Sequence, residues 1–185
     1  KLPELLASTG MLACGEDLGM IPDCVPEVMS ALKILSLEIQ RMPKDPKREF
    51  ADTWQYPYFS VCATSTHDMS PLRAWWKEDR EVTQKFWNQV LGKYGAAPEE
   101  CGPETCRSIL MMHLQPASLF AILPLQDYLS IKPELCAENP DDERINVPAI
   151  SPYYWRYRMK PCVEDLLADD VTASLRAMIR ECGRK

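Results

Sequence analysis

Short apolar runs alternate along the chain with stretches in which apolar residues recur at helical spacing. The pattern predicts strands over residues 11–15, 36–41, 60–64 and 118–123. It predicts helices over residues 27–33, 83–93, 103–113 and 170–182, with one more that begins at Ser70-Pro71 and holds Leu72, Trp75 and Trp76. This alternation is typical of repeated βα units around a parallel sheet.

Polar or acidic clusters follow three of the four predicted strands. These clusters are Glu16-Asp17, His67-Asp68 and Gln126-Asp127. A (β/α)8 barrel keeps its chemistry at the carboxyl ends of its strands and needs about 250 residues for its eight βα units. We therefore predict an α/β fold in which residues 1–185 form half of such a barrel, with further helices at the C-terminal end.

The acidic residues at the strand ends have two interpretations. Side chains alternate along a strand, so Glu16 and Asp17 cannot both enter a barrel lumen unless the chain turns between them. In a catalytic interpretation, one of the two residues would catalyse and the other would support the first. An acidic pair at a strand end is, however, more often a solvated turn or a helix cap. Asp68 could likewise start the next helix, and His67 could be structural. Two acidic strand ends on one rim could instead converge on one substrate, as glycosidic chemistry requires.

A Pro-rich polar loop after the second predicted strand leads into an aromatic patch. Long loops of this kind are usually functional or mobile. Trp54, Tyr56 and Tyr58 in this patch offer flat faces that could stack on sugar rings, with core packing as the alternative. For Trp75 and Trp76, on a predicted helix, core packing is favoured.

Composition excludes several classes of partner. The chain has 21 basic and 27 acidic residues, a formal charge of -6, and no basic run, which argues against nucleic acid. Its apolar runs fall far short of the ~20 residues of a membrane helix. The eight cysteines form no C-x-x-C pair and have no matching histidine cluster, which excludes a zinc ribbon or redox motif, and no spacing implies a metal or other cofactor. Several lie in apolar runs, which favours reduced thiols and a cytoplasmic location.

Several motifs, read in order, resemble the 4-α-glucanotransferases, the amylomaltase or disproportionating-enzyme family. They are Gly15-Glu16-Asp17-Leu18-Gly19 with Pro22 and Val25, Thr66-His67-Asp68, Pro124-Leu125-Gln126-Asp127 and Asn146-Val147-Pro148. Gln40-Arg41-Met42-Pro43, Leu72-Arg73-Ala74-Trp75-Trp76 and Tyr154-Trp155-Arg156 look closest to the plant-type cytosolic branch of that family. The resemblance covers nearly the whole chain and implies the C-terminal half of the catalytic barrel, about strands 5 to 8.

The resemblance also implies a retaining double displacement. Glu16 matches the general acid/base, and Asp68 matches the carboxylate that stabilises the oxocarbenium-like transition state. His67 matches a histidine that holds the same sugar. Substrate binding or support of the cleft is expected for Trp54, Tyr56, Gln126, Asp127 and Asn146. Expected substrates are maltose and malto-oligosaccharides, with acceptors derived from glycogen, starch or heteroglycan.

The family's nucleophilic aspartate stands in an Arg-x-Asp-His motif upstream of the glutamate strand. This chain has no such motif. We therefore expect a fragment that is inactive alone and whose full-length parent transfers α-1,4-glucosyl or glucan units. Two alternatives remain open, an α-glucan hydrolase with the same carboxylates and a noncatalytic glucan-binding or scaffold protein.

Overall fold

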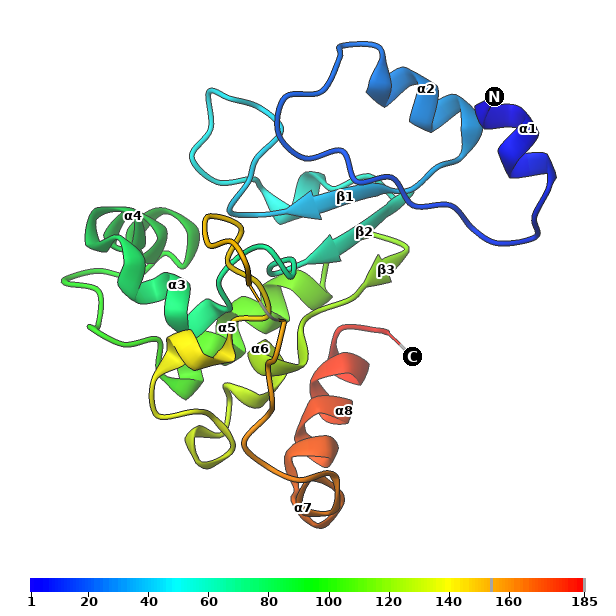
Figure 1. Ribbon diagram of the computed structural model, residues 1–185. Helices are drawn as coiled ribbons and strands as arrows, with labels where there is room; N and C mark the ends of the chain where they lie inside the picture. The colour runs from blue at the N-terminus through cyan, green and yellow to red at the C-terminus, as the bar shows by residue number, and fades with distance from the viewer. Residues whose placement is uncertain (154, 185) are drawn as a thin grey trace. The chain divides into compact units, whose positions relative to one another are not determined.

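The computed structural model describes residues 1–153 and 155–184 and divides into two compact units. The first, here called the sheet unit, combines Lys1–Ala63 with Pro116–Ile122. The second, the helical unit, combines Thr64–Gln115 with Leu123–Lys185. The chain thus crosses between the units at the end of a strand and returns for one more strand (Figure 1).

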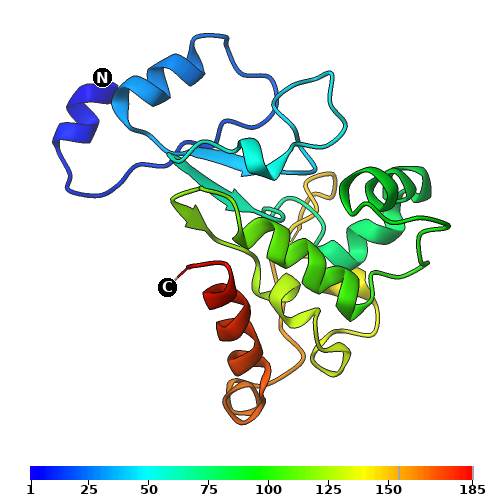
Figure 2. The same cartoon turned by 180° about the vertical axis from the view of Figure 1, so that it is seen from behind.

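A parallel sheet forms the centre of the sheet unit. Its strands are β1 (Ser36–Ile39), β2 (Ser60–Ala63) and β3 (Phe120–Ala121), paired in the order β1-β2-β3. Ser36 lies opposite Ser60, and Val61 lies opposite Phe120. Figures 1 and 2 show the three strands side by side from both directions. Three of the four predicted strands are thereby confirmed, and the chain is α/β.

The predicted strand over residues 11–15 forms only one bridge. Cys14 pairs in parallel with Leu35, just before β1, through hydrogen bonds from Gly15 N to Leu35 O at 2.8 Å and from Leu35 N to Ala13 O at 2.9 Å. This segment therefore lies beside the chain on the side of β1 away from β2. The parallel order then follows the sequence: segment 13–15, β1, β2, β3.

Helices of the sheet unit are α1 (Leu2–Ala7), α2 (Val25–Leu32) and the short 3-10 helix η1 (Thr53–Gln55). The predicted helix over residues 27–33 is confirmed by α2, which buries Met29 and ends at Lys33 in the left-handed conformation (φ 57°). Helix α1 was missed by the sequence pattern.

The helical unit contains the remaining helices of the described residues. They are α3 (Leu72–Glu78), α4 (Arg80–Lys85), the π-helix η2 (Phe86–Val90), α5 (Pro103–Leu114), α6 (Leu125–Leu129), η3 (Pro133–Leu135), η4 (Pro140–Glu143), α7 (Val163–Ala168) and α8 (Val171–Glu181). The predicted helix over residues 83–93 is divided between α4 and η2, because Leu91 N bonds Phe86 O, five residues back. The other predicted helices are confirmed by α3, α5 and α8.

Aromatic side chains of α3 and η2 pack together in a core. The rings of Trp75, Trp76 and Phe86 meet edge to face, with centroids 5.1 to 6.3 Å apart. All three side chains are buried. The predicted core role of Trp75 and Trp76 is confirmed, and this packing fixes α3 immediately after the His67-Asp68 segment.

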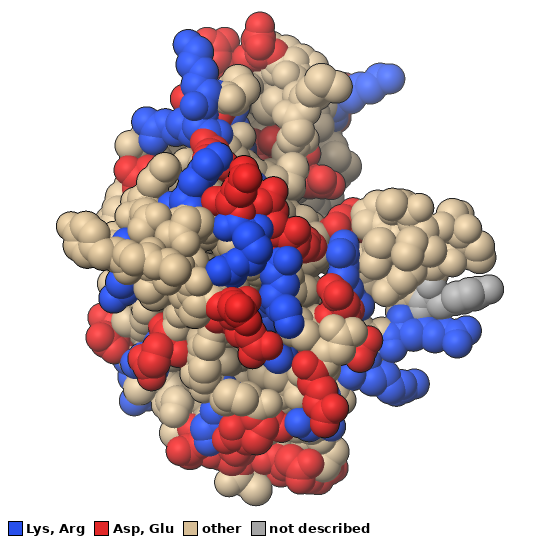
Figure 3. Space-filling view, turned by 90° about the vertical axis from the view of Figure 1, so that its left-hand side faces the viewer, with Lys and Arg blue, Asp and Glu red and all other residues tan. Residues whose placement is uncertain are grey.

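The surface carries charges of both signs. Lys and Arg are interspersed with Asp and Glu on the face shown in Figure 3. All eight cysteines are free thiols. Within residues 1–153 and 155–184, no helix has the length and apolarity needed to cross a membrane. The same residues contain no cluster of three or more His, Cys, Asp or Glu with metal-binding geometry.

Candidate active site

Glu16 and Asp17 follow the bridge segment of the sheet unit, and their side chains differ sharply in exposure. Glu16 is exposed, whereas Asp17 is 4% exposed. The Asp17 Oδ1 atom accepts a hydrogen bond from Leu37 N at 2.8 Å, and its Oδ2 lies 2.7 Å from Lys44 Nζ. Asp17 is therefore tied to β1, while Glu16 remains accessible from solvent.

Glycines allow this segment to approach its neighbours. A Cβ atom at Gly15 would lie 2.9 Å from the Cε atom of Met29 on α2, so a larger residue would displace that side chain. Gly19 has φ 79°, a left-handed conformation that favours glycine. The two glycines of the Gly15–Gly19 motif thus have steric and conformational roles on either side of Glu16.

His67 and Asp68 lie in the helical unit, on the segment between β2 and α3. Asp68 Oδ1 accepts a hydrogen bond from Asn146 Nδ2 at 2.5 Å, and Asp68 Oδ2 lies 3.3 Å from His67 Nε2. The His67 and Asp68 side chains are about half exposed. The structure therefore joins three sequence-predicted residues into one polar cluster, in which Asp68 and Asn146 are 78 positions apart in the chain.

Trp155 is a neighbour of this cluster that the sequence did not assign to the site. Its ring centroid lies 5.1 Å from that of His67, with a 39° angle between the ring planes. The sequence signal was the Tyr154-Trp155-Arg156 motif, which marked the resemblance without giving a role. Tyr154 itself lies outside the described residues. Because Trp155 is itself exposed, it provides an apolar face beside the polar cluster.

Gln126 and Asp127 are buried, at 4% and 1% exposure, on the first turn of α6. Asp127 Oδ2 accepts a hydrogen bond from Thr64 Oγ1 at 2.5 Å, and Oδ1 accepts one from Leu72 N at 2.8 Å. Gln126 Nε2 donates to the carbonyl of Glu143 at 3.2 Å. These contacts support the neighbouring segments, so sugar binding by either residue stays a prediction.

A partly buried ion pair anchors the segment that leads to Asn146. Arg73 Nη1 lies 3.1 Å from Glu143 Oε1, which also accepts a hydrogen bond from Ala137 N at 2.9 Å. Burial raises the pKa of the Glu143 carboxyl, against the opposing effects of its hydrogen bond to Ala137 and of the Arg73 charge. Since Glu143 is three residues before Asn146, this pair restricts where the Asn146 amide can lie.

The loop aromatics of the sheet unit divide into exposed and buried residues. Trp54 is 70% exposed, and the carboxylate of Asp52 caps its helix by accepting from Trp54 N at 3.1 Å. Tyr56, two residues later, is 6% exposed. Burial raises the pKa of the Tyr56 phenol well above its ordinary value. Trp54 is thus accessible for stacking on a ligand, whereas Tyr56 packs in the unit's interior.

A sheet of the parallel strands β1, β2 and β3 with helices between them places the chain among the α/β proteins. A sequence profile described as 4-alpha-glucanotransferase matches residues 2–164. The chain belongs to the 4-alpha-glucanotransferase family.

Individual relatives agree with this assignment. The chain is 44% identical to 4-alpha-glucanotransferase DPE2 from Oryza sativa subsp. japonica over 184 residues, which is 99% of this chain and 20% of the relative. It is 37% identical to the 4-alpha-glucanotransferase of Chlamydia trachomatis over 177 residues, covering 94% of this chain and 33% of that protein. The chain thus spans between a fifth and a third of the length of these two relatives.

Solved structures show the same fold. The amylomaltase from Streptococcus agalactiae in complex with acarbose superposes with a TM-score of 0.71 at 18% identity, covering 99% of this chain and 35% of the amylomaltase. The amylomaltase from Corynebacterium glutamicum gives a TM-score of 0.66 at 14% identity, with 95% and 29% coverage. At these identities the likeness concerns the fold.

Proposed function

We propose that the full-length protein containing this chain is a 4-α-glucanotransferase that moves α-1,4-glucosyl or glucan units from maltose or malto-oligosaccharides to a glucan acceptor. The observation that carries the proposal is the contrast at residues 16 and 17. The family resemblance implies an acid/base role for Glu16, and that side chain is exposed while Asp17 is held by β1 and Lys44. An acid/base must reach a substrate, and Glu16 is accessible to one.

The proposed reaction is a retaining double displacement. Glu16 donates its proton to the glycosidic oxygen as the bond to the donor sugar breaks, and a nucleophilic carboxylate forms a covalent bond to the anomeric carbon. Glu16 then removes the proton from the 4-hydroxyl of the acceptor, whose oxygen displaces that carboxylate. The nucleophile is proposed to lie in a part of the full-length protein outside these 185 residues, because no Arg-x-Asp-His motif stands in them.

Asp68 is proposed to stabilise the positive charge that develops on the donor sugar. Its two oxygens are oriented by Asn146 and His67, so little reorganisation would be needed when that charge forms. His67 would hold the same sugar, and the exposed rings of Trp155 and Trp54 would stack on sugar faces.

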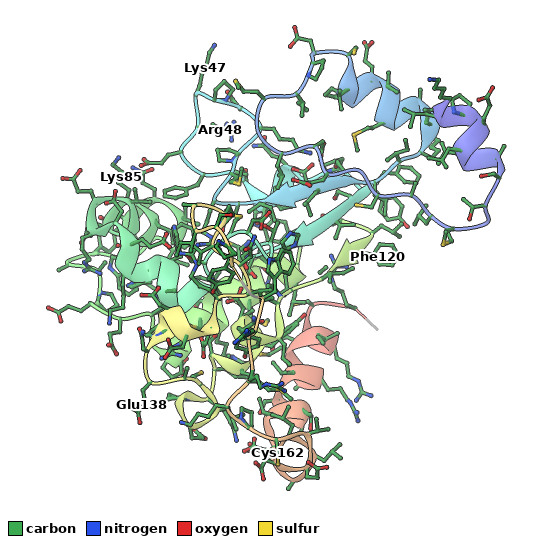
Figure 4. The ribbon with its side chains drawn as sticks, viewed as in Figure 1. Lys47, Arg48, Lys85, Phe120, Glu138 and Cys162 are labelled. Carbon is green, nitrogen blue, oxygen red and sulfur yellow. The ribbon has the colours of Figure 1, made fainter. Side chains whose placement is uncertain are left out.

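The fold is proposed to be half of a (β/α)8 barrel, about strands 5 to 8. Four parallel segments lie side by side in chain order, as consecutive barrel strands do. Phe120 on the outer strand β3 is 43% exposed and projects from the sheet unit in Figure 4, and Ile122 is 61% exposed. Remaining barrel strands would cover such apolar side chains.

Incubation of the full-length protein with maltotriose tests the function. A glucanotransferase should form glucose together with maltopentaose and longer oligosaccharides, separable by anion-exchange chromatography. Release of reducing sugar without any longer product would identify a hydrolase, and the absence of both products with retained glucan binding would identify a scaffold. Glycogen added as an acceptor distinguishes polymer from oligosaccharide use.

A further inference from the structure

Lys44 joins two carboxylates of the sheet unit. Its Nζ atom lies 2.7 Å from Asp17 Oδ2 and 2.7 Å from Glu38 Oε1. Ser36 Oγ donates a second hydrogen bond to Glu38 Oε1 at 2.8 Å. Asp17 and Glu38 are 4% and 8% exposed, whereas the Lys44 side chain is 31% exposed. The three residues form a charge cluster of two buried carboxylates and one partly exposed lysine side chain, here called the Lys44 bridge.

The Lys44 bridge connects three segments that are separate in sequence. Asp17 follows the segment that bridges Leu35 just before β1, Glu38 lies on β1, and Lys44 lies near the start of the long loop that later carries Trp54. Through its other oxygen, Asp17 also accepts from Leu37 N on β1 at 2.8 Å. The backbone next to Glu16 is therefore held to β1 by one hydrogen bond and to the loop by one ion pair.

We propose that Lys44 is a positioning residue for Glu16 in the glucosyl transfer, an inference that rests on the proposed function. Lys44 offsets one of the two negative charges of Asp17 and Glu38 and keeps Asp17 against β1. Because Glu16 is bonded directly to Asp17 along the backbone, the direction of the Glu16 carboxyl depends on this anchor.

The physical consequence of losing Lys44 follows from charge and burial. Two carboxylates would share a site that water reaches poorly, without the cation that both contact, and like charges in such a site repel. A carboxyl relieves such repulsion by taking up a proton or by moving, and movement of Asp17 out of the site would turn the 15–19 segment and displace Glu16. A displacement of about 1 Å from an optimal geometry can cost on the order of 100-fold in rate.

Lys44→Met in the full-length protein tests the positioning role, with Lys47→Met as the matched control. Lys47 is on the same loop, exposed, and at the outer tip in Figure 4. Each variant is assayed in two reactions. The first is disproportionation of maltotriose, which needs Glu16 as acid and as base. The second is transfer from α-maltosyl fluoride to azide. In this reaction the fluoride ion leaves without being protonated, and the azide ion displaces the enzyme carboxylate without giving up a proton. The reaction therefore needs neither an acid nor a base.

The expected result is a selective defect. Lys44→Met should lower kcat for maltotriose disproportionation roughly 10- to 100-fold with a small change in KM, and leave the fluoride-to-azide reaction within a factor of about two. Glu16→Gln should show the same selectivity with a larger loss. Lys47→Met should match the wild type in both reactions. Lys44→Arg, which preserves the cation between the two carboxylates, should fold and retain most of the disproportionation rate.

Three results would overturn the positioning role. If Lys44→Met lost the same share of its rate in both reactions, the substitution would have damaged the protein in general. An unchanged disproportionation rate would show that the bridge is dispensable. If Lys44→Arg lost as much rate as Lys44→Met, the positive charge would not be what matters. The Glu16→Gln variant distinguishes failure of the positioning role from failure of the proposed function. If this variant disproportionates maltotriose normally, the acid/base assignment itself is wrong.

Discussion

The Oδ1 atom of Asp127 accepts a hydrogen bond from the backbone nitrogen of Leu72, 2.8 Å away, where helix α3 begins. The other carboxylate oxygen accepts from Thr64 Oγ1, just beyond the end of β2. The two contacts lie on either side of residues 65–71, which include His67 and Asp68. A buried carboxylate on α6 thus fixes both ends of the segment that carries a proposed site residue.

Asp127→Ala should therefore destabilise the protein and weaken the site. Removal of the carboxylate leaves the Leu72 N–H and the Thr64 hydroxyl without this partner in a buried place. We expect a loss of about 2–5 kcal/mol in the free energy of unfolding, measured by urea denaturation. Asp141→Ala, at an exposed position, should change it by less than about 0.5 kcal/mol. Equal stabilities for the two variants would contradict the role given to Asp127.

Glu16→Gln in the full-length protein should remove proton transfer while leaving the shape of the side chain. The kcat for maltotriose disproportionation should fall by about 100- to 10,000-fold, since this is the usual contribution of a general acid or base. Binding of a maltooligosaccharide, measured by isothermal titration calorimetry, should change little. Turnover close to that of the wild type would refute the assigned role.

Asp68→Asn should lower kcat severely with less effect on KM, because the interaction that it removes is strongest in the transition state. Asn146→Ala should lower kcat in the same direction but less, since it releases Asp68 Oδ1 without removing the charge. Asn88→Ala, on the exposed side of η2, is the matched control. If only the affinity for maltotriose fell in Asp68→Asn, Asp68 would be a binding residue and nothing more.

Cys136 gives a prediction for alkaline stability. Burial raises the pKa of its thiol from 9.0 to about 11. Between these values the folded state holds a proton that the unfolded state has lost, so the stability contributed by the thiol is complete below pH 9 and is lost as the pH rises toward 11. The free energy of unfolding should fall over this range.

The slope of the free energy of unfolding against pH is the quantity to compare between variants. Urea denaturation from pH 8 to 11 should give a shallower decline for Cys136→Ala than for the wild type, whatever stability the missing side chain costs at pH 8. Cys24→Ala, at an exposed position, should keep the wild-type slope. A Cys136→Ala slope identical to that of the wild type would show that another group controls the loss of stability at alkaline pH.

Residue patterning predicted the main elements well, because local chemistry controls them. Proline in the first turn begins α2 and α5, and the compact apolar run in residues 60–64 forms the fully buried β2. The pattern was less successful at residues 11–15, where one bridge replaces a strand, and at residues 83–93, where a π-helix follows α4. Both outcomes depend on hydrogen bonds whose partners and spacing are not encoded in hydrophobic periodicity.

The candidate site shows the same division. Sequence motifs selected Asp68, Asn146 and His67, and the structure joins them. The motifs gave no role to Trp155, and they did not single out Lys44 at all. A contact between residues many positions apart becomes visible only when the chain is folded, so no local pattern could reveal the His67–Trp155 stack or the Lys44 bridge.

The sequence by itself determined the family motifs, the alternation of strands and helices, and the requirement that Glu16 and Asp17 take different roles, because adjacent side chains on an extended chain point in opposite directions. Only the tertiary structure decided which of the two is accessible. Asp17 is buried and bonded to Leu37 N and Lys44 Nζ in the sheet unit, whereas Glu16 is the carboxylate left exposed. That choice depends on the partners that folding brings to Asp17, and these lie 20 and 27 residues away in sequence.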